Sequence, residues 1–247
     1  IKKGESSIKQ MLNKLRSVPL FYWGEKVLVT LVSGYISTGE NSKFDFGPMN
    51  TTIGANTLEG LRLKTGGMTT ANLNKHLFAK GYAAYGFEDK KWKYNAQLEY
   101  SFNEKKYHSN EFPVHSLRAS HKYDLDRLGQ QYLYTNADNV FLALKRMPDK
   151  AVIYKQTSEL EYKLETESGF SVAAGFRYDV HEASRFMPFV DGYGNRYKDY
   201  KEASFNVALR YAPGEKCYQT KTSRIPINLD APVITLLHSY APKGFLG

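Results

Sequence analysis

Residues 92–102 read Trp-Lys-Tyr-Asn-Ala-Gln-Leu-Glu-Tyr-Ser-Phe, an unbroken alternation of apolar or aromatic side chains with polar or charged ones. Because successive side chains of a β-strand point to opposite faces, this segment predicts a strand with one apolar and one polar face. A transmembrane β-barrel has this pattern, with the apolar face toward lipid and the polar face toward water. A soluble β-sandwich has it too, with the apolar face packed into the core. The function depends on which of the two the chain adopts.

The same alternation returns along most of the chain, in segments separated by turn residues, and predicts an all-β, antiparallel protein of roughly ten to twelve strands. Gly66-Gly67 opens an expected polar stretch through Lys75, and the longest expected loop runs from His181 to Lys201. Short turns and long loops are expected to alternate, as at the two ends of a membrane barrel. The expected strands are 27–37, 43–55, 58–64, 78–87, 92–102, 116–125, 139–146, 152–164, 170–180, 203–211 and 233–240.

Composition is compatible with both architectures. The chain has 247 residues, enough for one large β domain. Its mean hydropathy is -0.51, and no apolar run is long enough for a spanning helix. Aromatic residues make up 14%, with 19 Tyr and 14 Phe. Such a content suits two aromatic girdles at membrane interfaces, and it also suits an aromatic carbohydrate-binding surface.

The formal net charge is +9, but Lys and Arg are spread singly along strands and turns. Because no basic helix or nucleic-acid motif accompanies them, we expect a basic interior and rim and no nucleic-acid partner. The single cysteine, Cys217, excludes an internal disulfide.

The first 19 residues differ from the rest. Ser6 or Ser7 can cap a helix that runs to about Val18, with Ile8, Met11, Leu12, Leu15 and Val18 on one face. Pro19 ends it. We therefore divide the chain into an amphipathic helix or linker, 1–19, and a barrel segment, 20–247. The chain begins without Met and stops within the pattern, so we expect a piece of a longer exported protein.

The length of the strands and the charges along their polar side favour the barrel over the sandwich. In hydrocarbon an unpaired backbone amide costs several kcal/mol, so strands must close into a ring. An Arg or Lys facing mid-bilayer costs about 2–4 kcal/mol. Leu98, Ala174 and Val207 are therefore expected toward lipid, with Glu99 and Arg210 on the aqueous side.

Several blocks carry a family resemblance. They are 46–51 (Phe-Gly-Pro-Met-Asn-Thr), 56–63 (Asn-Thr-Leu-Glu-Gly-Leu-Arg-Leu), 66–70, 81–87, 89–94, 211–216 and 225–228. With them the chain resembles a Bacteroidota outer-membrane family of uncharacterised function, whose members often carry an N-terminal carboxypeptidase-regulatory-like domain. The resemblance extends from about Leu20 onward. It implies an outer-membrane barrel, an upstream β-sandwich that is absent here, and no peptidase activity.

A second resemblance is more distant. The Glu-Gly-x-Arg-x-x-x-Gly pattern from Glu59 to Gly66 is similar to the barrel of the surface-antigen superfamily that includes the assembly factor BamA. The final strands of the barrel are missing after Gly247 by this comparison, so the chain is expected to be an incomplete portion of a larger barrel.

No constellation suggests catalysis, a metal or a cofactor. The six histidines are scattered, and His115 and His121 lie too far apart to hold one metal ion alone. No nucleophile elbow or P-loop is present. Asp179, His181 and Glu182 cluster at a strand end, where they could bind a cation, although a solvated rim is the expected explanation. We therefore expect no enzyme activity and no cofactor.

Glu59 and Arg62 form the polar pair that stands out. They lie in the most family-like segment beside Gly60, where the missing side chain permits a bulge or close backbone approach. Their opposite parity requires such a bulge before both can face the interior. The pair is a candidate lumen charge pair that positions a plug, a loop or a passing substrate; ordinary charges lining a watery interior are the alternative.

The leading hypothesis is an integral protein of the cell outer membrane, which contacts lipid and acts as an anchor and as a pore or an assembly and translocation device. Periplasmic or surface proteins would be its partners. The alternative is a soluble all-β binding module that stacks glycans on its aromatic faces.

Overall fold

The computed structural model describes residues 18–19, 24, 34–39, 41–128, 150–219, 224–228 and 232–245. The expected N-terminal helix, except for its last two positions, lies outside these residues, as do positions 27–33 of the expected strand 27–37 and the whole expected strand 139–146. The division of the chain at residue 19 therefore stays a prediction. Among the described residues, none belongs to a helix with the length and apolarity to cross a membrane.

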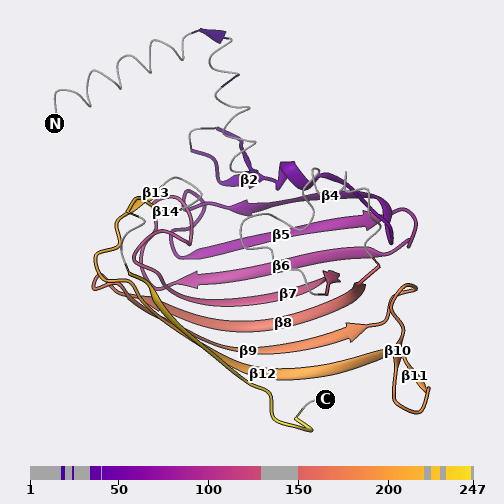
Figure 1. Ribbon diagram of the computed structural model, residues 1–247. Coiled ribbons are helices and arrows are strands. Elements are labelled where there is room, and N and C mark those ends of the chain that lie inside the picture. The colour runs from indigo at the N-terminus through magenta and orange to yellow at the C-terminus, as the bar shows by residue number, and fades with distance from the viewer. Residues whose placement is uncertain are drawn as a thin grey trace, which may run out of the picture.

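The described part is all-β and antiparallel, as predicted, and its strands form one large curved sheet (Figure 1). Eleven strands belong to this sheet, in the order β1-β2-β4-β5-β6-β7-β8-β9-β12-β15, with β3 also paired to β4. Two short hairpins, β10-β11 and β13-β14, stand apart from it. The strands are β1 (Ile36–Ser37), β2 (Phe44–Phe46), β3 (Ile53–Asn56), β4 (Gly60–Thr69), β5 (Leu77–Gly86), β6 (Trp92–Ser101), β7 (His115–Arg127), β8 (Val152–Glu165), β9 (Phe170–Glu182), β10 (Phe189–Val190), β11 (Arg196–Tyr197), β12 (Asp199–Tyr211), β13 (Cys217–Gln219), β14 (Arg224–Pro226) and β15 (Ile234–Tyr240).

The sheet is open within the described residues. Its path begins at β1 and ends at β15, and these two strands are not paired with each other. Every residue of β15 is exposed. The described strands form no closed ring, so the barrel, complete or incomplete, stays a prediction.

Two segments differ from the prediction. The expected strand 43–55 is divided into β2 and β3 by a 3₁₀ turn at Met49–Thr51. β4 continues through Gly66-Gly67, which were expected to open a polar loop. Both glycines lie too close to neighbouring strands for a side chain: a Cβ on Gly66 would come 2.3 Å from the carbonyl oxygen of Gly81. The glycines therefore serve close strand packing rather than a turn.

The strand connections also correct one expectation. At one end of the sheet, which we call rim A, the strands are joined by residues 57–59, 87–91, 128–151 and 183–198. At the other end, rim B, they are joined by residues 70–76, 102–114, 166–169 and 212–233. Short and long connections thus occur at both ends, so the expected segregation into short turns and long loops is wrong. The expected loop 181–201 shrinks because β9 and β12 are longer than predicted, and it contains the β10-β11 hairpin.

Candidate functional site: a charged inner face and an apolar outer face

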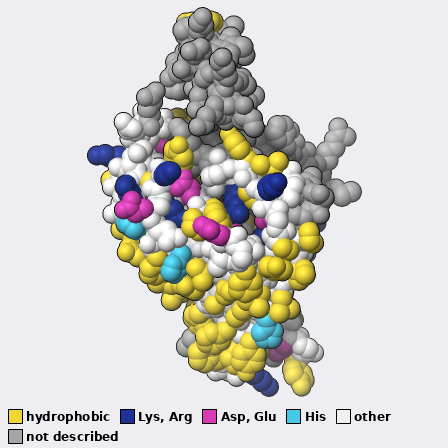
Figure 2. Space-filling view, turned by 90° about the vertical axis from the view of Figure 1, so that its left-hand side faces the viewer, with side chains coloured by type: hydrophobic (Ala, Val, Ile, Leu, Met, Phe, Trp, Pro, Cys, Tyr) yellow, Lys and Arg dark blue, Asp and Glu magenta, His cyan; other side chains and the backbone are white. Residues whose placement is uncertain are grey.

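The sheet exposes its apolar face and buries its polar face. On β6, Trp92 and Leu98 are 64% and 51% exposed, whereas Lys93 between them is fully buried. A soluble protein has the reverse arrangement, since Lys and Glu are almost never fully buried unless paired. We call the face of Trp92 and Leu98 the outer face and that of Lys93 the inner face. Viewed from rim B (Figure 2), charged side chains gather in the middle of the molecule and hydrophobic ones cover its lower part.

The structure brings the two predicted site residues, Glu59 and Arg62, together. Glu59 lies in the turn before β4, and Gly60 has a φ of +65°, in the left-handed region that favours glycine. This turn, and not a bulge inside the strand, directs both side chains inward. Nη1 of Arg62 lies 3.2 Å from Oε2 of Glu59, and both side chains are almost fully buried. The role of the pair in a lumen stays a prediction.

Asp124 of β7 is the strongest partner of Arg62, and the sequence analysis missed it. The guanidinium donates two hydrogen bonds to the Asp124 carboxylate, at 2.7 and 2.9 Å. The hydroxyl of Tyr82 donates to the same carboxylate. Such bidentate pairs are strong and directional. In sequence, Asp124 is one of several charges on the polar side of its strand, so only the fold distinguishes it.

The bond between Arg62 and Asp124 also reports the shape of the sheet. It joins β4 to β7, with β5 and β6 between them. In a flat sheet these two backbones would stand roughly 14 Å apart, at about 4.8 Å per strand step. A direct contact over that separation requires the sheet to curve toward its inner face. The inner face is therefore the concave one.

Lys93 and Asp89 extend the pair into a network. The ammonium of Lys93 lies 2.7 Å from Oε1 of Glu59 and also bonds Oδ2 of Asp89. The hydroxyl of Tyr154 donates to Asp89 at 2.8 Å. We call Glu59, Arg62, Asp89, Lys93 and Asp124 the charge network. It places three carboxylates and two cations in a region from which water is largely excluded.

Beyond the network, the inner face carries a series of cross-strand ion pairs. Arg118 contacts Glu161 at 2.8 Å, Arg177 contacts Glu159 at 2.9 Å, and Lys155 contacts Asp179 at 3.1 Å. The first two pairs are partly exposed. Opposite charges facing each other across an antiparallel pair stabilise it modestly. The inner face of the sheet is thus lined by paired charges of both signs.

On β5 to β8, aromatic side chains of the outer face gather toward the two ends of the strands, whereas Phe176 of β9 and Phe205 of β12 pack on each other level with Leu160. Toward rim A, Tyr85 packs on Trp92 with ring centroids 5.1 Å apart, and Tyr94 packs on Tyr123 at 6.2 Å. Toward rim B the contacts involve Tyr100, Phe102, His115 and Tyr162. Outer-face residues between these ends are mainly aliphatic, among them Ala79, Leu98, Ala119, Leu160 and Val207.

The predicted acidic and histidine cluster at the end of β9 is not brought together. Asp179 and His181 face inward and are buried, so the solvated rim expected for them is wrong. Asp179 pairs with Lys155, and His181 stacks on Tyr200 with ring centroids 4.4 Å apart. Glu182 accepts a hydrogen bond from Tyr123 instead. Within the described residues, no three His, Cys, Asp or Glu side chains could hold one metal ion.

Asp191 accepts several hydrogen bonds within one connecting segment. It lies in the β10-β11 hairpin at rim A and accepts bonds from the Asn195 side chain and the Tyr197 hydroxyl, both at 2.9 Å. The hydrogen bond from the Asn195 side-chain amide, together with others from the hairpin, lowers the pKa of Asp191 to about 2. The carboxylate organises the hairpin, which the sequence predicted only as a glycine-rich loop.

The fold and the network define a class: an all-β protein with an open, curved antiparallel sheet, charged on its concave face and apolar on its convex face. Comparison with protein families gives one match, the C-terminal domain of a family of unknown function, DUF5686, over residues 28–247. The chain belongs to this family. Comparison of the chain with curated proteins and with solved structures gives no match.

Proposed function

We propose that this chain forms part of the wall of an integral outer-membrane β-barrel, with its convex face against lipid and its concave face lining a polar lumen. The observation that carries the proposal is the inverted burial of β6, where Trp92 is 64% exposed and Lys93 is fully buried. In water, a contiguous apolar surface of this kind would drive association. In a bilayer the same surface is the stable one.

The aromatic residues support the same proposal. From Trp92 to Tyr100 the chain covers about 27 Å along the strand, at roughly 3.4 Å per residue. At a tilt of about 40° this distance projects to about 21 Å across the membrane, somewhat less than the apolar band of about 25 Å in outer-membrane barrels. A glycan-binding module would instead need its aromatic side chains clustered on one exposed surface.

The open edges at β1 and β15 require further strands in this setting, because unpaired backbone groups are not tolerated in hydrocarbon. The charged inner face suits a passage for polar cargo, either as a pore or as a device for protein assembly and translocation. Periplasmic or surface proteins are the partners that such a device would engage. The proposal assigns no reaction to the chain and no cofactor.

The first experiment uses the full-length protein in isolated envelopes. We expect extraction only with detergent and a gel mobility that changes on heating, as a folded barrel opens. A protein released by salt or alkaline carbonate without detergent would contradict the proposal. In a planar bilayer, discrete conductance steps would favour a pore, and silent insertion would favour assembly or translocation with an occluded lumen.

A further inference from the structure

The sheet divides at rim A between β6 and β7. These two strands pair with each other as far as Tyr94 and Tyr123. Beyond this point β6 continues beside β5 to Trp92, whereas β7 continues beside β8 to Arg127. We call residues 124–127 of β7 and residues 152–154 of β8 the β7–β8 end. Because it extends past the last pair with β6, this end can leave the curved surface of the sheet.

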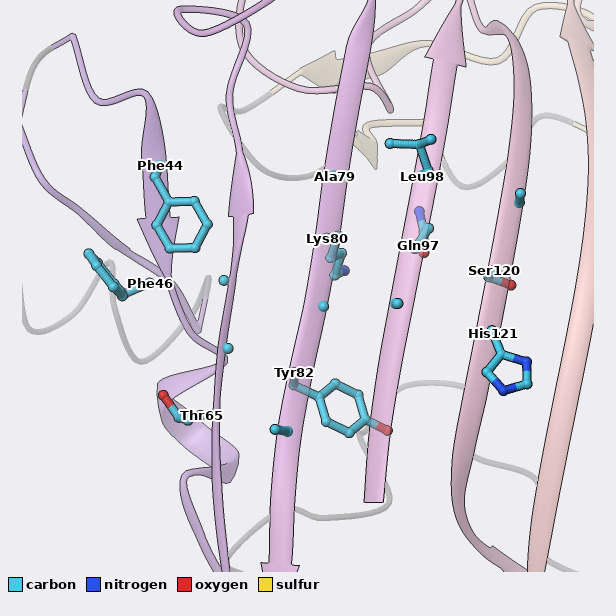
Figure 3. Close-up of a pocket in the computed structure, with 16 residues that line it drawn as sticks. Phe44, Phe46, Thr65, Ala79, Lys80, Tyr82, Gln97, Leu98, Ser120 and His121 are labelled. Atoms are coloured by element: carbon cyan, nitrogen blue, oxygen red, sulfur yellow. The ribbon is translucent and has the colours of Figure 1, made fainter. Parts of the chain in front are cut away.

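The β7–β8 end is buried on both of its faces. Val152 and Tyr154, which have the parity of the outer face, are 2% and 4% exposed, and Ile153 on the opposite face is fully buried. Elsewhere the outer face is uncovered: Leu160 of the same strand is 49% exposed, and Figure 3 shows Leu98 beside an open hollow of this face. A strand of a barrel wall keeps one face uncovered by protein. The β7–β8 end therefore lies inside the molecule.

Different contacts hold the two sides of the β7–β8 end. On the concave side, the carboxylate of Asp124 is held by Arg62 of β4. On the opposite side, Leu58 from the turn before β4 packs with the two buried apolar side chains of β8, and Phe186 covers this cluster. The charge network thus anchors the β7–β8 end at the concave face, and an apolar cluster seals its other side.

Residues 183–188, which follow β9, pass over the β7–β8 end, and we call them the strap. The guanidinium of Arg185 donates a hydrogen bond to the carbonyl oxygen of Thr57 at 2.7 Å and another to the Glu88 carboxylate at 2.6 Å. Thr57 and Glu88 lie in the turns before β4 and before β6, on one flank of β7 and β8, whereas the strap comes from the other flank. The strap therefore joins the two flanks.

Few contacts hold the strap in place. The side chains of Arg185 and Glu88 are both about half exposed, and exposed ion pairs contribute little to stability. The contacts of Asp124 with Arg62 are buried instead. The strap is thus the part of this arrangement that can open without breaking the charge network.

A strand end buried at the concave side of the sheet obstructs the space that the sheet partly encloses. We propose that the β7–β8 end is a plug that closes the polar interior at rim A, and that the strap is the latch that retains it. The inference rests on the proposed function, because only a wall around a polar lumen has a passage to close. Glu59 and Arg62 then position this plug, through the bond of Arg62 to Asp124.

The first test measures the burial of the plug in the full-length protein in detergent, with Cys217 and any upstream cysteine replaced by serine. Ile153→Cys reports on the plug, and Ala173→Cys, on the inner face of β9, is the matched control. A polar maleimide should label Ile153→Cys at least about tenfold more slowly than Ala173→Cys, because labelling of a buried thiol requires local opening. Heat-modifiable mobility checks that each variant has folded.

Opening of the latch should expose the plug. Arg185→Ala removes both bonds of the strap and should raise the labelling rate of Ile153→Cys by about tenfold, which corresponds to about 1.4 kcal/mol in the opening equilibrium. The rate at Ala173→Cys should not change. Lys75→Ala removes an exposed ion pair at rim B and should change neither rate.

Planar bilayers test whether the plug closes a passage. Glu88→Cys with Arg185→Cys removes the ion pair of the strap, and a short bifunctional methanethiosulfonate rejoins the two positions. The reduced protein should conduct about tenfold more than the rejoined one, and the rejoined protein should match the protein with an intact strap. Because the same molecules are compared in both states, folding is controlled.

The outcomes separate this inference from the proposed function. Equal labelling of Ile153→Cys and Ala173→Cys with an intact strap would overturn the plug, whether or not the protein spans a membrane. Equal conductance of the reduced and rejoined protein would overturn the closure of a passage and leave the membrane proposal standing. A protein released from envelopes without detergent would overturn the proposed function and the passage with it, even if Ile153→Cys is protected.

Discussion

The two faces of one sheet use opposite means of stabilisation. On the concave face, polar side chains are buried and satisfied by each other, as in the contacts of Arg62 with Glu59 and Asp124. On the convex face, large apolar side chains such as Leu98 remain half-exposed and have little to pack against. The alternation of most long strands does not say which face is outside, and on β5 the inner face itself carries Phe78 and Tyr82. The comparison teaches that burial, and not composition, distinguishes an exposed apolar face from a core.

The largest expected effect comes from breaking the charge network at its centre. Arg62→Met should destabilise the folded protein by about 3–5 kcal/mol, because it leaves Asp124 and Glu59 buried without their shared cation. Urea unfolding in detergent or vesicles measures it. Adding Asp124→Leu to Arg62→Met should recover part of the loss, since the uncompensated charge is then removed. A loss below about 1 kcal/mol for Arg62→Met, as for an exposed pair, would show that the network is solvated.

The outer face gives the next largest effect. Leu98→Arg should cost about 2–4 kcal/mol in a membrane, because a cation would face hydrocarbon. The matched control is Ser120→Arg on the inner face of β7, opposite Glu159, which should change stability by less than about 0.5 kcal/mol. Folding yield into vesicles, followed by urea titration, measures both variants. Equal tolerance of the two arginines would mean that the convex face meets water.

A smaller effect is expected for the partly exposed ion pairs of the concave face. A double-mutant cycle on Arg177 and Glu159 should give a coupling of about 0.2–1 kcal/mol that weakens as salt is added. The same cycle on Arg62 and Asp124 should give a larger coupling with little salt dependence. Similar values for the two cycles would remove the distinction between the charge network and the rest of the concave face.

The smallest effect concerns the rim, outside both faces. The pKa of Asp191 is lowered to about 2, so its contribution to hairpin stability is present above the ordinary carboxyl pKa near 4 and is lost as pH falls toward 2. NMR titration of the carboxyl group should give a midpoint near 2. Asn195→Ala should raise it toward the ordinary value, since the largest cause is the bond from Asn195. A midpoint near 4 in the unmodified protein would show that the hairpin bonds do not form in solution.

Much of the fold could be predicted from period-two alternation. Segments 92–102, 152–164, 170–180 and 203–211 correspond closely to β6, β8, β9 and β12. The prediction failed at Gly66-Gly67, because glycine occurs both in turns and where strands pack closely. These two glycines continue a strand, and neighbouring strands approach them closely. Glycine in a sequence indicates freedom of the backbone but does not distinguish a turn from tight packing.

The site was only partly predictable. Glu59 and Arg62 could be singled out because they lie near Gly60, which indicates a local departure from regular strand geometry. Asp124, Lys93 and Asp89 carry no such signal, since charges occur throughout the polar side of the strands. Their convergence depends on the bend of the sheet and on strand order, which bring Arg62 to a residue 62 positions away.

The contact between Arg62 and Asp124 constrains the curvature of the sheet. A side-chain contact of fixed length between the first and last of four neighbouring strands fixes how strongly the sheet curves over those strands. Replacing Asp124 with glutamate would lengthen that contact by one methylene and let the sheet relax outward. In the proposed barrel, the width of the lumen would then depend on the reach of this one pair of side chains, as well as on the number of strands.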